Sequence, residues 1–115
     1  MEKKNIDWSS LGFGYVQTDY RYVSNYKNGA WDEGALTTDA TVTLSESAGV
    51  FQYAQTCFEG MKAYRTADDT VQLFRPDCNA KRFQDSADRL CIPKIPVEDY
   101  IQAVEALVDV DRDWV

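Results

Sequence analysis

Two amphipathic helical patterns, interrupted by prolines, occupy the C-terminal third of the chain and constrain its fold more than any other feature. The first lies within DCNAKRFQDSADRL, where Asp77 or Asn79 is available as a helix cap. Its apolar residues recur at intervals of three to four, at Ala80, Phe83, Ala87 and Leu90. We expect this helix to be stopped by Pro93 and Pro96.

The second helical pattern follows Pro96. Glu98 and Asp99 fall in its first turn, where the helix dipole favours negative charge. A single apolar stripe runs along it, formed by Tyr100, Ile101, Val104, Leu107 and Val108. The chain ends on DRDWV directly after this pattern, which is typical of a sequence that continues further.

The first half of the chain carries strand patterns. Residues 15–26, YVQTDYRYVSNY, alternate with a period of two and are rich in Tyr, Val and Thr, which predicts a strand with one half-buried face. Asn28-Gly29 then predicts a tight turn, with a second strand from Ala30. Residues 34–43 indicate a loop or short strand, and Ser45 or Ser47 is available to cap a short helix after it.

A second hairpin is predicted by GMKAYRT, the polar turn Ala67-Asp68-Asp69 and TVQLFR, and Pro76 ends it. Strands followed by two helices predict an α+β domain, in which two main helices pack on an antiparallel sheet built from hairpins.

Composition limits the size and the partners of the chain. Its 115 residues, 44% hydrophobic and 27% charged, predict one soluble domain, and no apolar run approaches the roughly 18 residues of a membrane-spanning helix. We therefore expect no membrane partner, and because the net charge of −7 repels phosphate backbones we expect no nucleic-acid partner. The N-terminus lacks an apolar signal region, which favours a cytoplasmic location.

The cysteines and the lack of histidine restrict the chemistry. Cys57, Cys78 and Cys91 are odd in number and form no CxxC pair, which predicts free thiols and no metal site. Histidine is absent, which excludes His-based general bases, Ser–His or Cys–His nucleophile pairs and imidazole metal ligands.

Arg82 is the first candidate binding residue. Ser86 and Arg89 follow it at i+4 and i+7, and such a row can bind phosphate because a guanidinium presents forked donors. The alternative, which spacing alone favours, is an exposed ladder in which Asp85 pairs with both Lys81 and Arg89.

Several aromatic residues either line a ligand pocket or form the core. They are Phe13, Tyr15, Phe51, Tyr53, Phe58 and Tyr64. Lys62 alternates with Met61 and Ala63 on a predicted strand and therefore faces outward, which makes it a poor Schiff-base lysine. Glu46 and Glu59 suggest an acid/base pair, but a carboxylate beside a glycine more often shapes a turn or cap. These patterns leave the function open.

Four segments occur in order between Phe13 and Val115: FGYVQTDYRYV, CFEGMKAYR, LFRPDCNAKRFQDSADRLCIP and DRDWV. Together they resemble the N-terminal part of branched-chain amino acid aminotransferases, fold-type IV enzymes that depend on pyridoxal 5'-phosphate (PLP). The likeness is closer to these enzymes than to D-amino acid aminotransferases or aminodeoxychorismate lyases.

The resemblance implies that residues 1–115 are the N-terminal small domain of a two-domain enzyme, with the large catalytic domain outside this sequence. It implies that Arg82 binds the PLP phosphate, which reverses the preference drawn from spacing. It also implies that Phe13, Tyr53 and Phe58 line the pocket for the substrate side chain. The Schiff-base lysine belongs to the large domain, so no catalytic residue is assigned here, and Lys62 does not occupy that position.

The implied activity is transfer of the amino group of Leu, Ile or Val to 2-oxoglutarate, with 2-oxo acids and glutamate as partners. The enzyme would be a cytoplasmic homodimer of branched-chain amino acid biosynthesis, and we expect residues 1–115 alone to be inactive. The alternatives are a stand-alone ligand-binding module or another fold-type IV enzyme, of the D-amino acid aminotransferase or aminodeoxychorismate lyase type.

Overall fold

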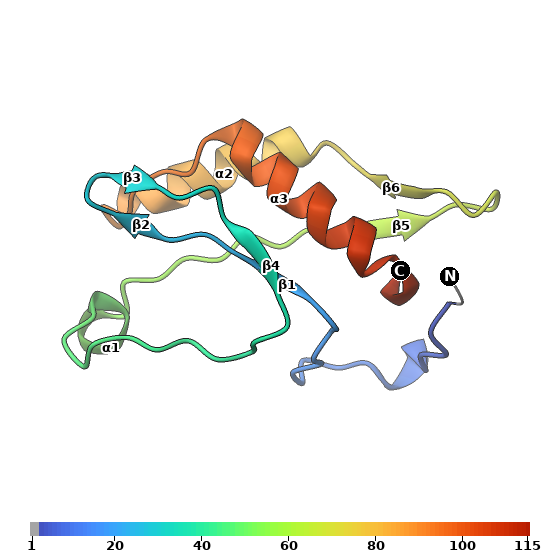
Figure 1. The fold of residues 1–115 in the computed structure, drawn as a ribbon. Coiled ribbons are helices and arrows are strands. Elements are labelled where there is room, and N and C mark those ends of the chain that lie inside the picture. Colours follow the sequence, from blue (N-terminus) through green and yellow to red (C-terminus); the bar gives the residue numbers. More distant parts are fainter. Residues whose placement is uncertain (1–2) are drawn as a thin grey trace.

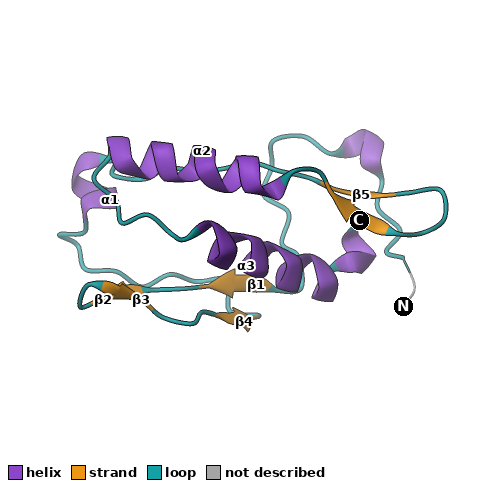
Figure 2. Cartoon of the chain, turned by 90° about the horizontal axis from the view of Figure 1, so that it is seen from above, coloured by secondary structure: helices purple, strands orange, loops and turns teal. Residues whose placement is uncertain are grey.

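The computed structural model describes residues 3–115 and confirms the α+β class. Two long helices lie side by side, and the second separates the first from a pair of strands (Figure 1 and Figure 2). The helices are α1 (Gly49–Tyr53), α2 (Pro76–Arg89) and α3 (Val97–Val110), with short 3-10 turns at Trp8–Ser10 and Arg112–Trp114. The strands are β1 (Arg21–Val23), β2 (Tyr26–Lys27), β3 (Ala30–Trp31), β4 (Ala35–Thr37), β5 (Ala63–Arg65) and β6 (Val71–Leu73).

Helix α2 begins earlier than predicted. Pro76 is its first residue, where a fixed φ and a missing N–H are tolerated, and Arg75 before it adopts a left-handed conformation with φ 46°. Asp77 and Asn79 are therefore inside the helix, and the prediction that either caps it is wrong. Their side chains have other partners, since Asp77 pairs with Lys81 at 3.3 Å and Asn79 donates to Glu59.

Helix α2 also ends by a different device from the predicted proline stop. The N–H groups of Cys91 and Ile92 donate to the carbonyl oxygens of Asp88 and Ala87, at 3.2 and 2.9 Å. Cys91 has a φ of 54°, so the helix closes with a Schellman motif in which cysteine takes the place usually held by glycine. The helix is thus complete before Pro93 is reached.

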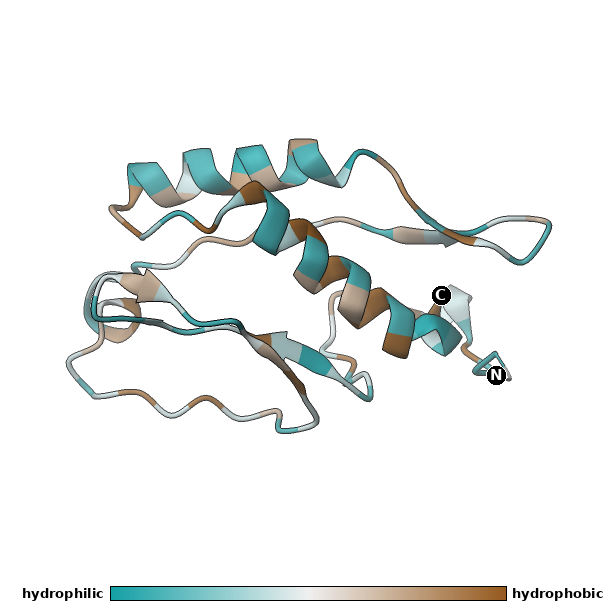
Figure 3. Ribbon diagram, turned by 45° about the horizontal axis from the view of Figure 1, so that its top comes forward, coloured by the Kyte–Doolittle hydropathy of each residue, from teal (hydrophilic) through white to brown (hydrophobic). Residues whose placement is uncertain are grey.

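Helix α3 matches its predicted position and contacts both α2 and β1. Its apolar stripe is half-buried, and Figure 3 shows hydrophobic residues along this helix while α2 is mostly hydrophilic. The buried apolar residues of α2 are Ala80 and Ala87, which are small enough to allow close packing of the two helices.

Residues 21–37 form one long hairpin interrupted in its middle. Strand β1 pairs with β4, and β2 pairs with β3, both antiparallel. Asn28 and Gly29 have φ values of 53° and 83°, which confirms the predicted tight turn. Between the two strand pairs, the Asp32 carboxylate takes the place of backbone pairing. It accepts from the N–H of Asn25 at 2.9 Å and from the N–H of Gly34 at 3.0 Å. The Asn25 N–H, followed by the Asn25 side chain, the Ser24 hydroxyl and the Gly34 N–H, lowers the pKa of Asp32 to about 2.

The strands are shorter and less connected than predicted. Within residues 3–115 there are three separate two-stranded sheets rather than one sheet carrying both helices. Residues 15–20 are not paired with another strand. The partner strand β4 is only three residues long, and all three of its residues pair with residues 21–23. The second hairpin, β5 with β6, is confirmed at its predicted position.

The predicted short helix is present as α1, but its cap is not the predicted one. Ala48 precedes the helix and makes no side-chain capping bond. Neither Ser45 nor Ser47 caps α1, because both are engaged in the preceding turn, where the Ser47 N–H donates to the Ser45 hydroxyl at 3.2 Å.

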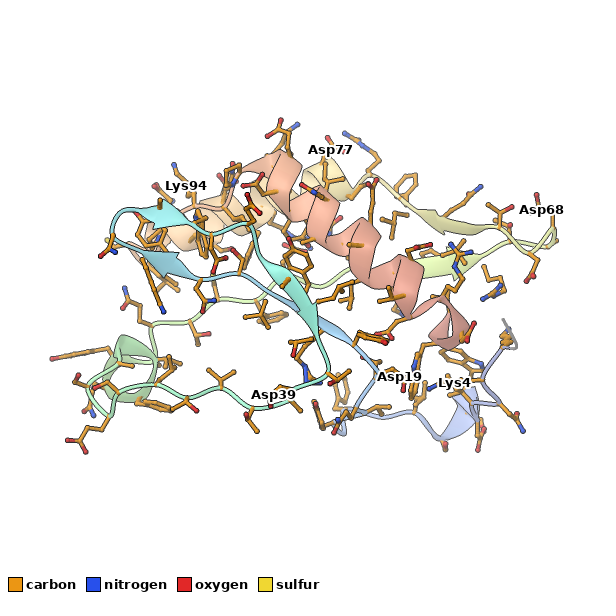
Figure 4. All side chains as sticks on the ribbon, in the orientation of Figure 1. Lys4, Asp19, Asp39, Asp68, Asp77 and Lys94 are labelled. Atoms are coloured by element: carbon orange, nitrogen blue, oxygen red, sulfur yellow. The ribbon has the colours of Figure 1, made fainter. Side chains whose placement is uncertain are left out.

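The two ends of the described chain are tied together. Asp19 forms an ion pair with Lys4 and accepts from the Trp114 indole at 3.1 Å (Figure 4). The carboxylate of Asp111, at the end of α3, accepts from the N–H of Tyr20 at 3.2 and 3.3 Å. These contacts fix the segment before β1 against the C-terminal turn. None of the described helices has the length and apolar character needed to cross a membrane.

Candidate functional site

Arg82 is held by an ion pair with Glu59, although 23 residues separate them in the sequence. Its Nε donates to Glu59 Oε2 at 2.7 Å, and its Nη2 donates to Oε1 of the same carboxylate. The side chain of Arg82 is 68% exposed, whereas that of Glu59 is only 4% exposed. One edge of the guanidinium is therefore hydrogen-bonded to Glu59, and the other edge is open to solvent.

The alternative of an exposed charge ladder along α2 is wrong. Lys81 pairs with Asp77, one turn earlier, and the ion pairs among the described residues do not include Asp85. Within the other interpretation, the row of phosphate donors, the Ser86 hydroxyl donates to the carbonyl oxygen of Arg82 at 3.1 Å. Of that row, Arg82 is the residue whose guanidinium is bound by Glu59.

Glu59 is saturated with donors. Besides Arg82, its Oε1 accepts from Asn79 Nδ2 at 2.9 Å and from the N–H of Gly60 at 3.1 Å. Asn79 Nδ2 also donates to the carbonyl oxygen of Gly60 at 3.1 Å. The Arg82 hydrogen bond is the main reason that the pKa of Glu59 falls to about 2, with Asn79 and Gly60 contributing. Glu59 thus stays ionised at neutral pH with its carboxylate bound by three residues, whereas Glu46 is exposed before α1.

The remaining donors of Arg82 form an outer edge that faces away from Glu59. An arginine carries five N–H donors in a planar fork, and the two that point at Glu59 belong to Nε and Nη2. Nη1 has no hydrogen-bond partner within residues 3–115. The outer edge, formed by Nη1 and Nη2, has the geometry that binds carboxylate and phosphate oxygens.

Tyr100 of α3 closes the inner side of this cluster. Its hydroxyl donates to Met61 Sδ at 3.6 Å, and its ring lies 5.8 Å from that of Phe83, one residue after Arg82. Burial raises the pKa of Tyr100, and the nearby carboxylate of Glu59 adds to the effect. The ion pair therefore lies where α2, α3 and the segment before β5 meet.

An apolar cavity of about 420 Å³ lies behind this cluster. Its lining includes the strand residues Tyr22 and Trp31, the helix residues Phe83 and Tyr100, and Cys57, which is a free cysteine. The other two cysteines are free as well, as predicted.

The predicted pocket aromatics lie on the surface. Phe13 is fully exposed, Tyr53 is 87% exposed and Phe58 is 90% exposed, and none of them lines the 420 Å³ cavity. Tyr15, Phe51 and Tyr64 are also exposed, so the alternative that these aromatics form the core is wrong. A pocket built from them needs a second wall.

Two further predictions concern Lys62 and metal binding. Lys62 is exposed and alternates with the half-buried Met61 and Ala63, as the strand pattern indicated. Within residues 3–115, His, Cys, Asp and Glu side chains do not gather into any group of three or more that could hold a metal ion.

Glu59 and Asn79 are the site residues that spacing did not identify. Glu59 accepts from both Arg82 and Asn79, and these bonds join the CFEGMKAYR segment to α2. The only sequence signal was the presence of a carboxylate and an arginine in two neighbouring motifs, and no periodicity relates them.

The chain is similar to known aminotransferases along nearly its whole length. No protein-family model matches it. It is 48% identical over 111 residues, 96% of the chain, to the branched-chain-amino-acid aminotransferase of Haemophilus influenzae. It is 45% identical over 114 residues, 98% of the chain, to branched-chain-amino-acid transaminase 1 of Bacillus subtilis. It is also 39% identical over 112 residues, 96% of the chain, to a methionine aminotransferase of Arabidopsis thaliana. The chain spans 32% of the length of each.

Proposed function

Because this chain belongs to the branched-chain-amino-acid aminotransferase family by homology over 96% of its residues, we propose that it forms the N-terminal small domain of such an enzyme. The full-length enzyme would transfer the amino group of Leu, Ile or Val to 2-oxoglutarate with PLP as cofactor. The observation that carries the proposal is the 48% identity to a relative of that name, across the segments that contain Arg82 and the exposed aromatics.

Arg82 is the residue of this chain that would hold the cofactor. PLP, when bound, supplies an electron sink for the reaction, which is chemistry that no side chain provides. The free outer edge of the Arg82 guanidinium fits a phosphate group, because it offers N–H donors in one plane and is exposed. Arg82 would thereby position the cofactor rather than take part in bond making.

Phe13, Tyr53 and Phe58 would provide one wall of the pocket for the substrate side chain. Branched-chain amino acids offer only hydrocarbon beyond the α-carbon, so burial against aromatic rings is the interaction available to recognise them, at about 25 cal/mol per Å². The exposure of these rings in residues 3–115 is consistent with a wall that is covered by the large domain or by a second subunit. Phe58 directly precedes Glu59, so the aromatic wall adjoins the Arg82 cluster.

The rest of the proposed enzyme lies outside these residues. The Schiff-base lysine would come from the large domain, so residues 1–115 alone would be inactive. We also propose that the enzyme is a cytoplasmic homodimer that acts in branched-chain amino acid biosynthesis.

An assay of the full-length enzyme tests the activity. The purified protein with PLP is given L-leucine, L-isoleucine or L-valine with 2-oxoglutarate, and formation of glutamate is followed. We expect turnover of all three, and none by residues 1–115 expressed alone. Turnover of D-alanine but not of L-leucine would instead identify a D-amino acid aminotransferase.

Methionine is a second candidate substrate, because one relative of 39% identity is named a methionine aminotransferase. The same assay with L-methionine ranks it against L-leucine by kcat/KM. A full-length protein that binds leucine without turnover would support the remaining alternative, a ligand-binding module.

A further inference from the structure

We propose that Glu59, itself fixed by Asn79, is a positioning residue that holds the Arg82 guanidinium ready for the cofactor phosphate. This inference rests on the proposed function, since it assumes that Arg82 binds a phosphate group. It concerns two residues of the chain that the family resemblance did not assign.

The carboxylate of Glu59 is itself held in place and can therefore anchor the Arg82 guanidinium. Its side chain is only 4% exposed, and Oε1 accepts from the N–H of Gly60 and from Asn79 Nδ2 in addition to Arg82. Asn79 is in turn fixed by its second bond, to the carbonyl oxygen of Gly60 at 3.1 Å. Glu59 is therefore held by its own segment and by the first turns of α2, so that it can orient a more mobile partner.

Arg82 needs such a partner. Its side chain is 68% exposed on the surface of α2, and a long exposed arginine samples many rotamers. The Ser86 hydroxyl, one turn later, binds the carbonyl oxygen of Arg82 and not its guanidinium. Two donors held by one carboxylate fix both the position and the plane of the guanidinium, and they leave Nη1 and part of Nη2 facing outward.

Two effects of Glu59 on anion binding oppose each other. Its negative charge weakens the attraction between Arg82 and a phosphate, whereas the fixed orientation lowers the ordering cost of binding. Arg82 is largely in solvent, where charge interactions are screened, so we expect orientation to dominate. If Glu59 mainly orients Arg82, removing its charge weakens PLP binding. If Glu59 mainly neutralises Arg82, removing its charge strengthens PLP binding.

The test compares PLP with pyridoxal, which lacks the phosphate, in the full-length enzyme stripped of cofactor. Dissociation constants for both are measured by absorbance for the wild type, Glu59→Gln, Arg82→Lys and the control Glu46→Gln, which alters an exposed carboxylate. We expect Glu59→Gln to weaken PLP binding about tenfold, with pyridoxal binding unchanged. We expect Glu46→Gln to change neither.

Each other outcome decides a different point. Equal or tighter PLP binding by Glu59→Gln, or an equal loss for PLP and pyridoxal, would overturn the positioning role. If Arg82→Lys leaves PLP affinity unchanged, the phosphate role of Arg82 itself fails. Should Glu59→Gln not fold, Asn79→Ala serves instead, because it removes one donor from the carboxylate but keeps the ion pair. This variant should weaken PLP binding about threefold and leave pyridoxal unaffected; unchanged PLP binding would overturn the inference.

Discussion

The ring of Tyr22 lies directly against Gly34. A Cβ atom on Gly34 would be 2.6 Å from the Tyr22 hydroxyl oxygen, and that hydroxyl donates to the carbonyl oxygen of Glu33 at 2.6 Å. Gly34 also has a φ of 68°, which side-chain-bearing residues rarely adopt. This contact holds together the interrupted middle of the hairpin that α3 covers through β1.

Gly34→Ala should therefore destabilise the protein strongly. It adds left-handed strain of about 1 kcal/mol and forces the Tyr22 ring from its place, for a total loss of roughly 3 kcal/mol. Gly29→Ala is the matched control, because Gly29 has a φ of 83° but a Cβ atom added to it would meet nothing within 4 Å. It should cost only about 1 kcal/mol, as measured by urea unfolding. Equal losses for the two variants would contradict the steric role of Tyr22.

The Glu59–Arg82 pair should make stability depend on pH. The pKa of Glu59 is lowered to about 2 from an ordinary value of 4.5, so its contribution is fully present above pH 4.5 and is lost as the pH falls towards 2. Glu59→Gln should thus be less stable than the wild type at pH 7, and the difference should shrink between pH 4.5 and about 2. The stability difference between the wild type and Glu59→Gln is measured from urea midpoints at neutral pH and across this acidic range, with Glu46→Gln as the control. A stability difference that does not change with pH would refute this linkage.

Tyr53→Ala should impair turnover without weakening the fold. The ring is 87% exposed in residues 3–115, so we expect a change in unfolding free energy within about 0.5 kcal/mol. Loss of the proposed pocket wall should raise the KM for leucine about tenfold in the full-length enzyme. Phe74→Ala removes an aromatic ring that is 78% exposed and outside the proposed pocket, and should leave the KM unchanged. Unaltered kinetics of Tyr53→Ala with Leu, Ile and Val would count against this wall.

Arg65 should be required for the C-terminal turn. Its Nη2 donates to the carbonyl oxygen of Arg112 at 2.6 Å and its Nη1 pairs with Asp69 at 2.8 Å, and the side chain is only 17% exposed. A lysine cannot make both bonds, so Arg65→Lys should lower the unfolding free energy by about 1–3 kcal/mol. Arg112→Lys, which alters a more exposed ion pair with Asp109, should cost about 0–1 kcal/mol. The midpoints of thermal unfolding are measured for both variants. Similar decreases for the two would argue against a special role of Arg65 in holding the C-terminal turn.

Local sequence patterns were enough to predict the order and type of the main elements. Apolar spacing located α3 within the residues that form it, and Asn28-Gly29 specified a turn that needs two positive φ values. Both signals depend on neighbours within one turn of helix or across one tight turn. The motifs that include Arg82 were likewise sufficient to indicate the family before any geometry was known.

Packing between distant segments set where the elements end and how the site is assembled. Residues 15–20 have the composition of a strand but no partner, and a strand forms only where its hydrogen bonds are met by another segment. Spacing along α2 paired Asp85 with its helical neighbours, whereas the fold brings Arg82 to Glu59, 23 residues away, at a junction with α3. That choice was outside the reach of local patterns, because a buried carboxylate binds whichever donors packing places around it.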